Sequence, residues 1–137
     1  MTQEDKELLL RDLSARLPYG VMVDRLGTPH KVLAIEPSQL NCIMIDRGEF
    51  MPAFYSIEDV KLYLRPMSSM TEDEKEEYEK LCILIPTQFD SDLQKYDYYT
   101  TDSMESFDWL LKNHFDVRDL IEKGLAIAVT EDNNPYK

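Results

Sequence analysis

The first seventeen residues have the hydrophobic spacing of an amphipathic helix. Four leucines recur at helical spacing: Leu9, Leu10, Leu13 and Leu17. Thr2 and Asp5 form a capping box in which Asp stands in place of the usual Glu, and Pro18 cannot continue a helix. The pattern predicts a helix over residues 1–17 that ends near Arg16.

Between residues 18 and 66 the hydrophobic pattern changes to the alternation that is typical of short strands. Apolar residues gather in five runs separated by turn residues, at 21–23, 32–35, 40–45, 50–55 and 62–64. Pro52 suits an edge strand better than a central one, and Ser56 caps a single helical turn at 57–60. Five short strands at this spacing predict a small antiparallel five-stranded curled sheet or SH3-like barrel. The likeness to an SH3-like barrel is one of element order and element length.

A second helix is predicted after residue 70. Thr71 and Glu74 form a capping box, and the helix stops before Pro86. Its apolar face contains four residues: Tyr78, Leu81, Cys82 and Ile85. Residues 86–105 carry little periodicity, so we expect a long irregular segment there, with an added strand over 96–101 as the alternative because Tyr and Thr favour strands.

The last part of the chain predicts two short helices and a closing strand. Two helical faces follow each other, one at 107–115 and one at 117–121, and Gly124 ends the second as a left-handed cap. Leu125, Ile127 and Val129 alternate along a strand that we expect to join the sheet.

These elements predict one α+β domain over residues 1–137, because the length and the 43% hydrophobic composition suffice for a single core. It comprises an N-terminal helix at 1–17, the curled sheet or barrel at 18–66, and an acidic helical part with the closing strand at 67–137. The alternative architecture is an open sheet with all helices on one face.

Negative charge is concentrated in one segment. Residues 71–108 hold twelve Asp and Glu against three Lys, a local net charge of −9 out of −12 for the chain. Such a surface repels phosphate backbones and anionic lipid headgroups, so we expect neither nucleic acid nor membrane as a partner. The acidic start does not resemble a signal peptide, and no window is long and apolar enough to cross a bilayer, so we expect a cytoplasmic protein. The sequence does not specify the oligomeric state.

Motifs for catalysis and cofactors are absent. The chain has no GxSxG, no GxGxxG and no GxxxxGK[ST], so we assign no catalytic residue, no cofactor and no metal ligand. Cys42 and Cys82 are expected to be two buried free thiols.

One acid and base constellation is the alternative to a non-catalytic protein. His114 lies near four carboxylates in sequence: Asp97, Asp102, Asp108 and Asp116. Such groups can bind a divalent metal or transfer protons, which gives the reading of a small metal-dependent hydrolase or a ligand-binding protein. The spacing is unspecific, since Asp116 suits the N-cap of the next helix and His114 suits a packing position.

The binding hypothesis rests on aromatic side chains interleaved with carboxylates. Six residues are candidate partner-binding residues: Tyr96, Asp97, Tyr98, Tyr99, Asp102 and Trp109. Tyr and Trp give broad contact area at low entropic cost, and the carboxylates select a basic protein surface. Alternatively these aromatics only cover the core, which for Trp109 is an equally good account; Tyr98 and Tyr99 cannot both point inward from a strand, because neighbours alternate faces.

Three segments carry a resemblance to a known family: Leu17-Pro-Tyr-Gly-Val21, residues 65–74 and residues 107–126. Residues 65–74 read RPMSSMTEDE and residues 107–126 read FDWLLKNHFDVRDLIEKGLA. In these segments the chain resembles a family of short uncharacterised proteins from gut Bacteroidetes and their phages or mobile elements. The resemblance implies a bacterial cytoplasmic setting, or the host cytoplasm for a phage-encoded protein, and it supplies no catalytic residue.

The sequence thus leaves two functions. The first is a non-catalytic acidic module that binds a basic surface of a protein; a phage version would occupy a nucleic-acid site of a host protein by imitating its charge. The second is the small hydrolase or ligand-binding protein that uses carboxylates near His114.

Overall fold

The structure is a computed structural model that describes all residues, Met1–Lys137. The N-terminal helix α1 (Gln3–Arg16) begins with the predicted capping box, in which the Thr2 hydroxyl accepts a hydrogen bond from the Asp5 amide at 3.0 Å. A 3₁₀ turn, η1 (Leu17–Tyr19), follows and ends at Gly20, whose φ of +80° needs a residue without Cβ. The sequence therefore predicts both ends of this helix.

Six strands form the main sheet, in the order β4-β3-β2-β1-β5-β8. Their bounds are β1 (Met22–Arg25), β2 (Thr28–Ile35), β3 (Ile43–Arg47), β4 (Phe50–Tyr55), β5 (Lys61–Leu64) and β8 (Ala126–Ala128). All neighbours are antiparallel except β5 and β8, which are parallel. The fold is α+β with a mostly antiparallel sheet. This sheet has six strands where a five-stranded arrangement was predicted, and the sixth is the closing strand, which joins the sheet as expected, at the free edge of β5.

Local details of this sheet follow the sequence. Pro52 lies in β4, which is an edge strand as predicted. An edge strand tolerates proline because one of its sides forms no backbone hydrogen bonds with another strand. Ser56 caps the short 3₁₀ turn η2 (Ile57–Asp59), where a single helical turn was predicted. A further 3₁₀ turn, η3 (Met67–Ser69), follows β5.

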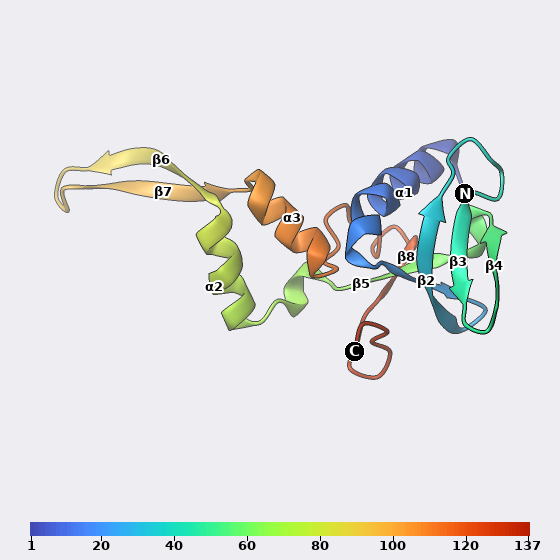
Figure 1. Ribbon diagram of the computed structural model, residues 1–137. Helices are drawn as coiled ribbons and strands as arrows, with labels where there is room; N and C mark the ends of the chain where they lie inside the picture. Colours follow the sequence, from blue (N-terminus) through green and yellow to red (C-terminus); the bar gives the residue numbers. More distant parts are fainter.

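The hydrophobic core lies between α1 and the inner face of the sheet (Figure 1). Leu9 and Leu13 of α1 are fully buried against residues of the strands, and Cys42 is buried beside them. Cys82 is only half-buried, so the prediction of two buried thiols is wrong for this residue, although both cysteines are free.

Residues 72–112 form an arm that projects from this body (Figure 1). It comprises α2 (Glu72–Leu81), β6 (Ile83–Asp90), β7 (Lys95–Thr101) and α3 (Met104–Lys112). β6 and β7 pair only with each other. The prediction of an irregular segment at 86–105 is wrong, and the alternative, a strand at 96–101, is confirmed. The helix that was predicted to stop before Pro86 ends at Leu81, because Ile83–Ile85 belong to β6.

The chain after α3 differs from the second predicted helix. Residues 113–125 form turns, with φ of +66° at His114 and +57° at Asp119, which a continuous helix does not allow. Asp116 accepts hydrogen bonds from the amides of Leu120 and Ile121, at 3.0 Å each, so it stabilises a turn and not a helix N-terminus. Gly124 has the predicted left-handed conformation, with φ of +74°.

None of the α-helices combines the length and the apolar character that a membrane span requires.

Candidate protein-interaction site

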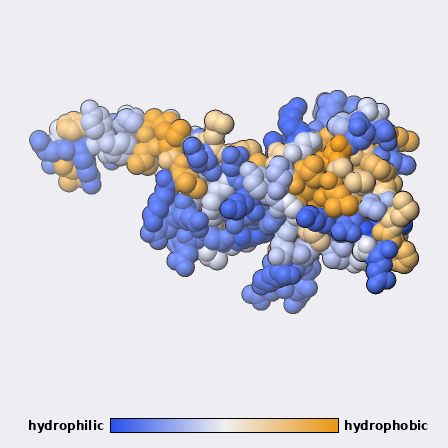
Figure 2. Space-filling view, viewed as in Figure 1, coloured by the Kyte–Doolittle hydropathy of each residue, from blue (hydrophilic) through white to orange (hydrophobic).

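The β6–β7 hairpin presents an uncharged, aromatic face to solvent. The pairing register places Phe89 opposite Tyr96 and Pro86 opposite Tyr98, and ring centroids lie 5.0 Å apart in Phe89–Tyr96 and 6.5 Å apart in Tyr96–Tyr98. We define the apolar face as the five residues that share this side: Leu84, Pro86, Phe89, Tyr96 and Tyr98. Leu84 and the three aromatic side chains of this face are about half exposed, from 49% for Phe89 to 61% for Leu84. Figure 2 shows hydrophobic patches along the projecting hairpin. An exposed patch of this kind is typical of an interaction surface.

The opposite face carries the charges of the hairpin. Since neighbouring residues of a strand alternate sides, Lys95, Asp97 and Tyr99 lie together on this face. Tyr98 and Tyr99 therefore point to opposite sides, as expected, and both are more than half exposed. The predicted partner-binding residues are split, with Tyr96 and Tyr98 on one face and Asp97 and Tyr99 on the other.

The root of the hairpin is fixed by contacts between α2 and α3. The Tyr78 hydroxyl and the Ser106 hydroxyl both donate hydrogen bonds to the Asp102 carboxylate. Burial, and secondly the neighbouring Asp102 carboxylate, raise the pKa of Tyr78. The Trp109 ring lies between Tyr78, at a centroid distance of 5.7 Å, and Phe115, at 5.8 Å. Asp102 and Trp109 thus make contacts within the chain that hold the hairpin in place.

The arm is strongly acidic in three dimensions as well as in sequence. Residues 72–112 hold twelve Asp and Glu against four Lys, a net charge of −8. Of the six acids in α2, Glu74 binds Arg65 through two oxygens at 2.6 and 2.7 Å, and Glu76 lies 3.6 Å from Lys80. The hydrogen bonds from Arg65 lower the pKa of Glu74 to about 2. The other four carboxylates of α2 form no ion pair within the chain.

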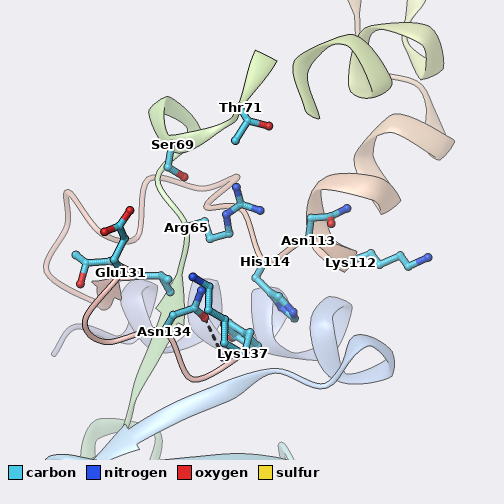
Figure 3. A pocket seen from close by; sticks show the side chains of 12 residues that line it. Arg65, Ser69, Thr71, Lys112, Asn113, His114, Glu131, Asn134 and Lys137 are labelled. Carbon is cyan, nitrogen blue, oxygen red and sulfur yellow. Dashed lines mark hydrogen bonds between the residues drawn. The ribbon is translucent and has the colours of Figure 1, made fainter. Parts of the chain in front are cut away.

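A pocket of about 670 Å³ lies at the C-terminal end of α3, between Arg65 and the C-terminal segment (Figure 3). Arg65, Lys112, His114, Glu131 and Lys137 are among its lining residues. The two lysines and Arg65 outnumber the single carboxylate of Glu131, but Arg65 is already paired with Glu74. The lining of the pocket is mostly polar, and the pocket is open to solvent.

Two titratable groups that line this pocket have strongly perturbed pKa values: burial raises the pKa of Tyr136 to about 12, and the pKa of His114 is lowered. The His114 ring stacks on Tyr136 with a centroid distance of 3.5 Å, and its Nδ1 is buried without a hydrogen-bond partner. Burial, followed by the positive charges of Arg16 and Arg65, lowers the pKa of His114 to about 4. The imidazole is therefore neutral at pH 7.

The carboxylates expected near His114 are not gathered around it. The structure brings no three His, Cys, Asp or Glu side chains together in a set that could hold a metal ion. Asp97 lies on the hairpin, Asp102 at its root, and Asp116 accepts hydrogen bonds from backbone amides. The charges that lower the pKa of His114 are the positive charges of Arg16 and Arg65, and positive charges repel a metal ion.

The sequence did not identify three members of the apolar face as candidates: Leu84, Pro86 and Phe89. The apolar run Ile83–Ile85 is typical of a strand, but its spacing also matched the apolar face predicted for the second helix. The partner strand was the missing information, because the apolar face forms only when β6 and β7 pair.

Comparison of the chain with protein-family models, with curated proteins and with solved structures finds no match.

Proposed function

We propose that this protein is a non-catalytic acidic interaction module that binds a basic surface of another protein through its α2–β6–β7 arm. The observation that carries the proposal is the projecting hairpin, on which Tyr96, Tyr98 and Tyr99 are all at least half exposed beside unpaired carboxylates. Tyrosines supply contact area and carboxylates supply selectivity for cations.

The split of the candidate residues between two faces constrains how a partner binds. A flat surface can contact Tyr96 and Tyr98, or Asp97 and Tyr99, but not both pairs. A partner that uses all four residues must hold the hairpin in a groove or lie along one of its edges. Asp102 and Trp109 then contribute by holding the root of the hairpin in place. Asp102 is also exposed, so its charge adds to the negative charge of the arm.

The family resemblance of the sequence suggests the setting of this interaction. A protein of phages or mobile elements that acts in the cytoplasm of a host bacterium would meet many basic nucleic-acid-binding surfaces. We propose that the arm occupies such a surface on a host protein by imitating the charge of a nucleic acid. We also propose an SH3-like curl for β1–β5, which their order in the sheet and the η2 turn before β5 support.

The test is capture of proteins from a cytoplasmic extract of a Bacteroidetes bacterium by the immobilised chain. Three forms are compared: wild type, a hairpin variant with Tyr96→Ser, Tyr98→Ser and Asp97→Asn, and a control with Glu122→Gln. Glu122 is exposed and lies outside the arm. We expect one or more basic proteins to bind wild type and control, to be lost from the hairpin variant, and to elute in about 0.5 M salt because the attraction is screened.

Equal capture by wild type and the hairpin variant would contradict the proposal. So would a clear rise in melting temperature on adding millimolar Mg²⁺, Mn²⁺ or Zn²⁺, because a ligand that binds the native state stabilises it and a metal site would then be present.

A further inference from the structure

The edges of the β6–β7 sheet are open. The sheet has two strands, so each strand has a neighbour on one side only. An isolated two-stranded hairpin is marginally stable in water, and a third strand or a packed face is the usual remedy. An unpaired edge also presents a row of N–H and C=O groups that can pair with another strand.

The position of Pro86 distinguishes the two edges. Proline has no N–H and is accommodated in a strand where its nitrogen faces the unpaired side. Pro86 therefore interrupts the outer edge of β6, whereas β7 contains no proline. β7 is the edge that can accept a complete strand.

The same pairing identifies the groups on the β7 edge. Pro86 lies opposite Tyr98. In an antiparallel ladder, residues of a pair that exchange no hydrogen bonds point their backbone groups outward on both strands, and this alternates along the strand. The backbone N–H and C=O groups of Tyr96, Tyr98 and Thr100 accordingly face the open side of β7.

A strand added at this edge would continue both faces of the hairpin. On one side its residues would lie beside Tyr96 and Tyr98 of the apolar face. On the other side they would lie beside Lys95, Asp97 and Tyr99 of β7, with Asp90 opposite Lys95 at the tip. Tyr96 and Tyr98 on one face favour apolar side chains, and Asp97 together with the negative net charge of the arm favours basic ones on the other face. The two kinds would alternate along the added strand, since side chains of a strand have a period of two.

A second copy of this chain fits the edge poorly. The arm, residues 72–112, has a net charge of −8, and a second arm would bring the same charge to the contact. Like charges placed together in an interface are unfavourable. Charge complementarity therefore favours a different protein with a basic segment.

We propose that the partner binds by adding an extended segment of alternating basic and apolar residues to the outer edge of β7. This inference rests on the proposed function, since it states how the basic partner is held. Backbone hydrogen bonds supply register, the apolar face supplies contact area, and Asp97 selects a cationic side chain. This geometry also explains how residues on opposite faces of the hairpin can contact one partner.

The probe for the test is a synthetic seven-residue peptide of alternating Lys and Val, acetylated and amidated. It is compared with a scrambled peptide of the same composition and with the alternating peptide N-methylated at every second amide. Binding to the full chain is measured by fluorescence anisotropy at low salt, for wild type, Thr100→Pro and Thr100→Val. Thr100→Pro removes one outward N–H, while Thr100→Val keeps it and is the matched control.

We expect the alternating peptide to bind about tenfold more tightly than the scrambled and N-methylated peptides. We expect Thr100→Pro to lose this advantage and Thr100→Val to keep it. If Thr100→Pro does not fold, the N-methylated peptide still tests the edge on the wild-type protein.

Equal binding of all three peptides would overturn strand addition and leave acidic docking intact, because charge alone would then explain the affinity. Absence of binding by any peptide would also overturn it, and the capture experiment decides whether the proposed function falls as well. A wild-type dimer in sedimentation that Thr100→Pro converts to a monomer would show that a second copy occupies the edge, against the proposal.

Discussion

Replacing Asp12 with asparagine removes the only negative charge of a buried ionic cluster. Asp12 and Arg16 both have 0% exposure. The Asp12 carboxylate accepts a hydrogen bond from Arg16 Nε at 2.7 Å and another from Arg118 Nη1 at 2.8 Å. Arg16 Nη2 also donates to the Phe115 carbonyl oxygen at 2.7 Å. The cluster therefore joins α1 to the segment after α3.

The size of the effect follows from the charge that is left behind. Removing one partner of a buried ion pair costs about 3–5 kcal/mol, because the other charge stays desolvated. Arg16 has no route to solvent, whereas the Arg118 side chain is 21% exposed and can be hydrated. We therefore expect Asp12→Asn to lower the free energy of unfolding by about 4 kcal/mol. For a chain of this length that corresponds to a fall in melting temperature of about 10–20 °C.

The measurement is urea unfolding followed by far-ultraviolet circular dichroism. The exposed residue Glu7 on the same helix gives the control, since Glu7→Gln removes the same charge at the surface and should cost less than about 0.5 kcal/mol. The double variant Asp12→Leu with Arg16→Met should recover part of the loss, because it removes both fully buried charges but leaves the Phe115 carbonyl oxygen without its donor. The reasoning is refuted if Asp12→Asn costs no more than Glu7→Gln.

Two further predictions concern the pocket and the hairpin. Because the folded pKa of His114 is about 4 and the unfolded value about 6.5, only the unfolded chain takes up this proton as the pH falls through that window, so stability decreases. Between pH 7 and pH 5 the wild type should lose about 1–2 kcal/mol more than His114→Gln in urea unfolding, and parallel losses in both proteins would contradict this. Gln94, in the turn between β6 and β7, has a φ of +54°, so Gln94→Gly should stabilise the hairpin by about 0.5–1 kcal/mol. Slower amide hydrogen exchange in β7 checks this prediction, and unchanged or faster exchange would show that the turn is not strained.

Much of the body could be predicted because its signals are local. The capping boxes at Thr2 and Thr71 and the strand at 50–55 all occur where the sequence placed them. The sequence singled out Tyr96, Tyr98 and Tyr99 as candidates, but it identified neither the hairpin that presents them nor the residues of β6 that share its apolar face. The Tyr and Thr residues at 96–101 favoured a strand, yet nothing within that segment specified its partner.

The sequence by itself determined where helices begin, where turns fall and where negative charge accumulates, because caps, periodicity and charge depend on residues a few positions apart. Only the tertiary structure decided that Ile83–Asp90 pairs with Lys95–Thr101, and that this pairing separates an aromatic face from a charged one. It also decided that Arg16 is buried, since the Asp12 carboxylate and the Phe115 carbonyl that compensate its charge meet it only in the folded chain. Pairing and desolvation depend on contacts between distant segments, which a local pattern does not encode.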